Sequence, residues 1–128
     1  MFSGIAMPDP YEKLTVWKLA DDLVLEVYRV TTAFPLSEKY ALALQLRRAA
    51  LSIPTNIVEG NARNHRREYI QFCHIARGSI AEIKYLMHVS MRLQLLQRAE
   101  YDLLYARYDQ LGKLLQAMIN RLATVNDK

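Results

Sequence analysis

Cysteine, proline and glycine are all scarce in this 128-residue chain, which holds one cysteine, four prolines and four glycines. A single cysteine excludes an internal disulfide and provides no thiolate pair for a metal cluster. This residue, Cys73, lies beside Phe72 in a helical pattern, so we predict a buried and unreactive thiol. The length is that of one domain, large enough to bury a substantial core.

Long apolar runs are missing as well. No run approaches the roughly 18 apolar residues of a membrane-spanning helix, so no such segment is predicted. Residues 1–10 lack the features of a secretory signal, and we expect a flexible N-terminal tail there and a cytoplasmic protein. A net charge of +4 permits a polyanionic partner, although solubility explains this charge equally well.

The sequence also lacks groupings of residues that carry catalysis or hold metals. The histidines, His65, His74 and His88, form no i, i+4 pair, and no Glu-x-x-His motif occurs. The acids are scattered, and a glycine-rich phosphate loop is missing. We therefore expect no enzyme, no metal and no cofactor. An enzyme with its site at a subunit interface remains the weakest of three alternatives.

Apolar residues recur at helical spacing along most of the chain. The pattern predicts helices over 14–33, 38–62, 65–96 and 99–125, with Ser37 and Asn64 as N-caps of the second and third. The last helix has the clearest stripe, made by Tyr101, Leu104, Tyr108, Leu111, Leu115, Met118 and Leu122. Short loops force neighbouring helices to be antiparallel, so the sequence predicts an all-α, up-down-up-down four-helix bundle over 11–125.

Pro54 stands inside the second predicted helix, in the segment QLRRAALSIPTNIVEG at 45–60. Proline removes an N–H donor and clashes with the carbonyl four residues before it, here that of Ala50, at a cost of about 3 kcal/mol. We predict that the helix continues through Pro54 with a kink.

Positive charge is concentrated in one quarter of the chain. Of the 17 basic and 13 acidic residues, six arginines and two glutamates fall within 47–77, so the rest of the chain is balanced. Arginine suits phosphate because its planar fork binds two oxygens at once. The candidate nucleic-acid-binding residues are Arg63, Arg66, Arg67 and Arg77.

Structural pairing is the alternative for these arginines. Arg47, Arg48 or Arg77 would then pair with Glu59, Glu68 or Glu82, within or between subunits. Arg47 and Arg48 lie within the second helix beside two alanines, and we expect at least one of them to be partly buried against an acid. The competing function is a structural or protein–protein adaptor whose arginines serve subunit contacts. Salt-dependent binding of RNA or DNA separates the two.

Apolar surface exceeds what one core requires. Leu25 lies opposite the stripe of the first helix, among charged residues, and the third helix is apolar nearly all round. A helix that is apolar on every side is buried on every side. This surplus predicts subunit contacts in a homo-oligomer.

Three segments carry a resemblance to one family. The segments that carry the resemblance are YEKLTVWKLADDLVLEVYRVT, FPLSEKYALALQLRRAALSIPTNIVEG and RREYIQFCHIARGSIAEI. Over nearly its whole length the chain resembles the four-helix-bundle family of ribosomal-RNA intervening-sequence proteins. The segment around Pro54 is the most specific. Val58 and Asn61 depart from the family pattern without touching the arginines or the proline.

The resemblance implies properties that the helical pattern does not. Members form homopentameric rings, and their genes occur in intervening sequences of 23S ribosomal RNA and elsewhere in bacterial genomes. The family is also similar to the accessory variability protein of diversity-generating retroelements, a basic pentamer that binds nucleic acid and a reverse transcriptase. These likenesses imply RNA, DNA, a reverse transcriptase or another protein as partners, and no membrane.

Overall fold

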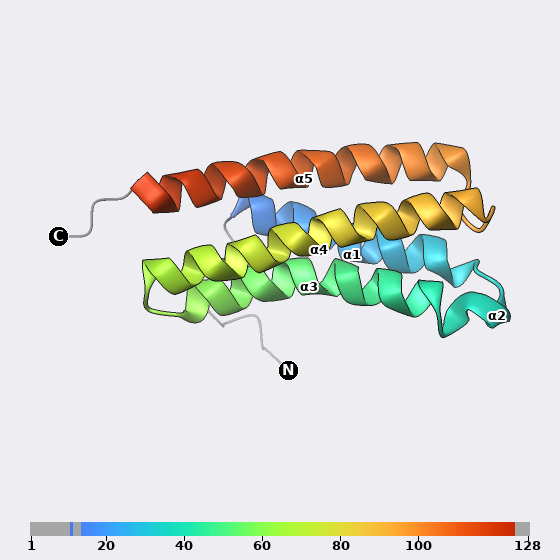
Figure 1. The fold of residues 1–128 in the computed structure, drawn as a ribbon, viewed down its shortest axis with the longest axis horizontal. Coiled ribbons are helices and arrows are strands. Elements are labelled where there is room, and N and C mark those ends of the chain that lie inside the picture. The colour runs from blue at the N-terminus through green and yellow to red at the C-terminus, as the bar shows by residue number, and fades with distance from the viewer. Residues whose placement is uncertain (1–10, 12–13, 125–128) are drawn as a thin grey trace, which may run out of the picture.

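The computed structural model describes Tyr11 and residues 14–124, which form four long helices and one short helix. Their bounds are α1 Thr15–Thr32, α2 Leu36–Lys39, α3 Leu42–Ala62, α4 Arg66–Arg92 and α5 Arg98–Thr124. The long helices run alternately in opposite directions, and α2 lies at one end of the bundle (Figure 1). α1 packs against α3 and α5, and α4 packs against the same two helices. The predicted all-α, up-down-up-down four-helix bundle is confirmed. The tail predicted at 1–10 lies outside the described residues.

The apolar stripes read from the sequence form the core. In α5, Leu104, Tyr108, Leu111, Leu115 and Met118 are buried, and in α1 the buried stripe includes Val16, Ala20, Leu23 and Val27. The predicted burial of Cys73 is also confirmed, and burial raises the pKa of its thiol to about 11. Such a thiol is protonated at neutral pH and is a poor nucleophile.

α3 continues through Pro54, as predicted, with Leu42–Ala62 in one helix. The carbonyl of Ala50 lacks its usual helical donor because proline has no N–H. Pro54 is buried and lines a groove with Trp17 of α1, so its ring contributes to the packing of α3 on α1. The kink expected at this position stays a prediction.

The prediction of one helix over 38–62 with Ser37 as its N-cap is wrong at the start. Ser37 lies inside the short helix α2, whose N-cap is Pro35, and Ala41 separates α2 from α3 with φ −119° and ψ −96°. α2 buries none of its residues, and Leu36 is 73% exposed. No core contact therefore holds α2 in line with α3.

The third predicted helix, 65–96, is too long at both ends. The structure has α4 over Arg66–Arg92 with His65, not Asn64, at the N-cap position. Gln94, with φ 62°, lies in the left-handed region just after the helix. This conformation ends α4, and sequence reasoning missed the end because that conformation is usually marked by glycine.

Two hydrogen bonds complete this helix end as a Schellman motif. The Gln94 N–H donates to Met91 O at 2.9 Å, and the Leu95 N–H donates to Ser90 O at 2.9 Å. The turn directs Leu96 back into the core, where it is 5% exposed. The α4–α5 connection is therefore a packed turn.

Candidate nucleic-acid interface

α3 and α4 approach each other closely at Gly60, just before the turn that carries the arginines. A Cβ added at Gly60 would lie 2.8 Å from Tyr69 Cδ1 and 2.9 Å from Phe72 Cβ. Beside this contact, the Asn61 side-chain amide donates to the Tyr69 hydroxyl at 3.5 Å. Burial of Tyr69 raises the pKa of its hydroxyl, so the group stays neutral and donates or accepts hydrogen bonds. Only glycine at position 60 allows α3 and α4 to approach this closely, and the contact fixes the position of the turn at residues 63–65.

The turn brings three of the predicted arginines to one end of the bundle, opposite α2 (Figure 1). Arg63 follows α3 in an extended conformation, and Arg66 and Arg67 begin α4. Arg63 and Arg67 are exposed, whereas Arg66 is half-buried. We call Arg63, Arg66 and Arg67 the turn arginines.

Arg63 is held by an aromatic ring more than by an acid. Its guanidinium carbon lies 5.1 Å from the centroid of the Phe72 ring, within the range of a cation–π contact. Its Nε is 4.0 Å from Glu68 Oε1, and both side chains are about half exposed. A pair this long and this exposed contributes little to stability. Arg63 therefore keeps most of its hydrogen-bond donors for another acceptor.

Arg77, the fourth candidate, lies apart from the turn arginines. It is exposed on α4, about 16 Å from Arg66 along the helix at 1.5 Å per residue. Its Nη1 donates to Gln116 Oε1 of α5, and Gln116 Nε2 donates to Asn120 Oδ1 at 2.9 Å. The structure therefore does not unite all four candidates in one cluster.

Arg47 is half-buried, as expected of one member of the twin pair, but its partners differ from the expected acid. Its Nε donates to Thr31 Oγ1 at 2.8 Å, and its Nη2 lies 3.4 Å from Tyr28 O. Its guanidinium carbon also lies 4.4 Å from the centroid of the Tyr28 ring. The polar groups at the end of α1 satisfy this arginine, so no acid is needed there. Arg48 is exposed.

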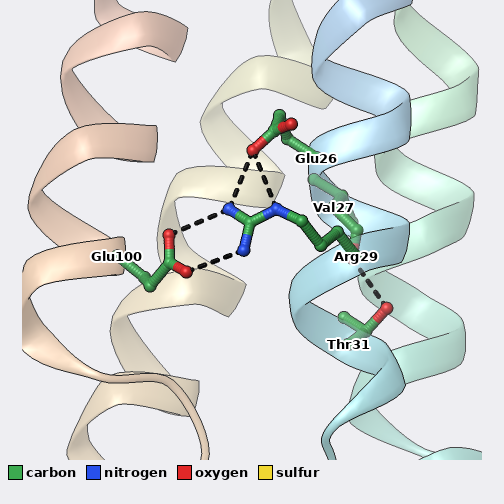
Figure 2. A network of polar contacts seen from close by, with 5 residues as sticks. All are labelled: Glu26, Val27, Arg29, Thr31 and Glu100. Carbon is green, nitrogen blue, oxygen red and sulfur yellow. Dashed lines mark hydrogen bonds and ion pairs between the residues drawn. The ribbon is translucent and has the colours of Figure 1, made fainter.

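Sequence reasoning missed a link between α1 and α5 at the other end of the bundle. The Arg29 guanidinium donates to both carboxylate oxygens of Glu100 at 2.9 and 3.0 Å, and to Glu26 Oε1 at 2.8 Å (Figure 2). Hydrogen bonds from Arg29 lower the pKa of Glu100. The Glu26–Arg29 spacing of three could have been noticed, but no signal links Glu100 to Arg29, 71 residues before it.

A cluster of aromatic rings between α4 and α5 was missed as well. The rings of Tyr85 and His88 are stacked with centroids 6.4 Å apart, and His88 lies 6.3 Å from Tyr101, which is 5.6 Å from Tyr105. Lys84 joins them, with its Nζ 4.8 Å from the Tyr105 centroid. These rings come from two helices, so no local spacing predicts the cluster.

Metal binding needs converging ligands, and a membrane span needs a long apolar helix. Within Tyr11 and residues 14–124, no three histidine, cysteine or acidic side chains are placed to hold a metal ion. No helix among the described residues is long and apolar enough to cross a membrane. Leu25, predicted to point outward, is 67% exposed in the isolated chain.

Comparison with known proteins places this chain in a family. The profile of the 23S rRNA-intervening sequence protein matches residues 12–117. The fold is similar to a crystal structure of a protein of unknown function from the S23 ribosomal protein family of Bacteroides thetaiotaomicron, with a TM-score of 0.74 and 20% identity over 82% of this chain and 98% of that chain. Curated proteins gave no significant match. Neither description names an enzymatic activity. Because the profile covers most of its length, the chain belongs to the 23S rRNA-intervening sequence protein family.

Proposed function

We propose that this protein is a non-enzymatic bundle that associates with RNA or DNA through the turn arginines, Arg63, Arg66 and Arg67. One observation supports the proposal above others: the turn gathers three arginines at one end of the bundle, in the quarter of the chain that holds the whole charge surplus. Glu68 Oε1 lies 4.0 Å from Arg63 Nε, and both side chains are about half exposed. A phosphate group offers Arg63 a better acceptor.

The helix that begins here adds to the attraction for an anion. The N-terminus of a helix carries a partial positive charge and N–H groups that point outward, which together favour phosphate. The N-cap residue of α4, His65, makes no capping hydrogen bond with its side chain. The positive N-terminus of α4 repels the positive charges of Arg66 and Arg67, and a bound anion relieves this repulsion.

Replacing the turn arginines tests the proposal. We expect Arg63→Ala, Arg66→Ala and Arg67→Ala, combined in one variant, to weaken binding of a fluorescent RNA or DNA oligonucleotide. The dependence of log affinity on log salt should flatten by about 0.7–0.9 for each phosphate that the arginines no longer neutralise. The matched control replaces Lys39, Arg98 and Lys113 with alanine, because these exposed cations lie away from the α3–α4 turn. Equal weakening in both variants would reduce the effect to net charge and overturn a localised site.

We further propose that the protein self-associates, and the resemblance favours a pentamer. Exposed apolar side chains support this: Leu25 is 67% exposed, and Leu44 and Leu51 of α3 are each 41% exposed. Arg48 is also available to a subunit contact. Light scattering should give a multiple of 14.8 kDa, and Leu25→Asp should reduce that mass. A monomeric wild type at micromolar concentration would contradict self-association and leave the exposed leucines unexplained.

The remaining partners follow from the resemblance alone. We propose, from the resemblance, a likeness to accessory variability proteins. This likeness would bring a reverse transcriptase or another protein as partner. A cytoplasmic location is also part of the proposal. The adaptor function is the alternative if nucleic acid does not bind. In that case Arg77 and Arg48 are expected at subunit contacts, because Arg77 already makes a bond between helices.

A further inference from the structure

Arginine, lysine and histidine side chains form a stripe along one side of α4. It consists of Arg67, His74, Arg77, Lys84, His88 and Arg92. At about 100° of rotation per residue, these six positions fall within a sector of about 100°. All six are exposed or half-buried, so the expectation that this helix is apolar nearly all round is wrong. The stripe therefore starts at the turn arginines and continues along the whole outer side of α4.

The acids of α4 lie away from this stripe. Glu68 and Glu82 project more than about 100° from the centre of the sector. From α5, Asp109 lies beside the stripe. Its Oδ1 accepts a hydrogen bond from Lys84 at 2.9 Å, and its Oδ2 lies 3.6 Å from Lys113 Nζ. Lys84 is thus neutralised locally, whereas the bond from Arg77 goes to the uncharged Gln116. The stripe keeps a net positive charge.

An aromatic ring lies in the same sector. Tyr85 is 65% exposed, although its ring stacks on His88 on one side. The two rings have centroids 6.4 Å apart and planes 30° apart, and they border a shallow hollow that Arg92 and Leu93 also line. An exposed ring held by a second ring is a suitable platform for a nucleic-acid base. A cation beside it, here Arg92, is positioned for the phosphate.

We propose that a single-stranded nucleic acid lies along the outer side of α4, with phosphates on Arg67, Arg77 and Arg92 and a base stacked on Tyr85. This inference rests on the proposed function and names its partner as single-stranded. Bases within a duplex are stacked on each other and offer no face to a protein ring, so an aromatic platform selects unpaired bases. From Arg67 to Arg92 the track is about 37 Å long at 1.5 Å per residue, enough for several nucleotides.

The test compares a single-stranded RNA of about fifteen nucleotides, within the site sizes of single-strand binders, with a duplex of the same length. Wild type should prefer the single strand. Tyr85→Ala should weaken single-strand binding about 5- to 150-fold, the effect expected for one stacked base, and leave duplex affinity unchanged. Tyr85→Phe keeps the ring and should bind as wild type does. Tyr40→Ala is the matched control, since Tyr40 follows α2, outside the stripe, and is 81% exposed.

Arg92→Ala provides a second, electrostatic measurement. It should reduce the slope of log affinity against log salt for the single strand by about 0.7, the value for one neutralised phosphate. Tyr85 and Arg92 are both exposed, so replacing either should leave the fold intact, and circular dichroism verifies this. If wild type prefers the duplex, or if Tyr85→Ala binds the single strand as tightly as wild type does while salt-sensitive binding persists, this inference fails and the proposed function stands. If no nucleic acid binds, both fail.

Discussion

Arg47 Nε donates a 2.8 Å hydrogen bond to Thr31 Oγ1, which in turn donates to the Val27 carbonyl at 2.7 Å. The arginine of α3 thereby binds the hydroxyl of a residue that is 1% exposed and belongs to the last turn of α1. Figure 2 shows Thr31 directed toward Val27 on the same helix. This chain of two bonds joins α1 to α3 without an acid.

We therefore expect Arg47→Ala to lower the free energy of unfolding by about 1–3 kcal/mol, because it removes a hydrogen bond from a charged donor and leaves Thr31 with one partner fewer. Urea unfolding measures the change. Its neighbour Arg48 is exposed, so Arg48→Ala should alter the free energy by less than about 0.5 kcal/mol. Equal effects of the two substitutions would show that the bond to Thr31 is not what distinguishes Arg47.

The ion pair of Arg29 with Glu100 predicts a dependence of stability on pH. Because the pKa of Glu100 is lowered from 4.5 in the folded protein, its contribution to stability is present above 4.5 and is lost as the pH falls through the lowered value. Wild type should melt at a higher temperature than Glu100→Gln at about pH 7, and the difference should vanish at about pH 2. A difference that stays constant between these pH values would contradict the pairing.

Two glycines of helical segments should respond in opposite ways to alanine. Gly60→Ala should destabilise the protein by about 1–3 kcal/mol, because the added Cβ overlaps with Tyr69 and Phe72. Gly78 has no atom within 4 Å of an added Cβ, so Gly78→Ala should raise the free energy of unfolding by about 0.5–1 kcal/mol. Denaturant midpoints measure both, and a neutral Gly60→Ala would show that α3 and α4 separate there at no cost.

The hydroxyl of Tyr108 is buried and has no hydrogen-bond partner among the described residues. An unsatisfied buried hydroxyl costs about 1–3 kcal/mol, so Tyr108→Phe should raise the free energy of unfolding, as measured by urea denaturation. Tyr85→Phe, on the exposed side of α4, should leave it unchanged. A destabilised Tyr108→Phe would reveal a partner for this hydroxyl, such as a buried water.

The sequence predicts the bundle because helix spacing is a local property. Stripes such as Leu104–Tyr108–Leu111 record which side of each helix is buried, and short loops leave antiparallel packing as the solution. Pro54 within a helix was predictable too, since apolar residues keep helical spacing on both sides of it. The break at Ala41 was not predictable, because it results from a lack of core contacts for α2, a property of the folded molecule.

The candidate site was predictable in part. The position of the turn arginines follows from the helix boundaries. Their separation from Arg77, the partners of Arg47 and the rings around His88 depend on which helix lies beside which. The hydrogen bonds of Arg47 to Thr31 and of Arg77 to Gln116 span 16 and 39 positions, and no spacing rule within one helix reaches that far.

Binding through the turn arginines is tested most directly by the affinity of the wild type for RNA and DNA between about 50 and 200 mM salt. We predict that log affinity falls linearly with log salt, and that the variant without Arg63, Arg66 and Arg67 gives a flatter line while its fold and mass are unchanged. A wild type whose affinity is independent of salt, or that binds neither nucleic acid, would contradict this function and leave the adaptor function in its place.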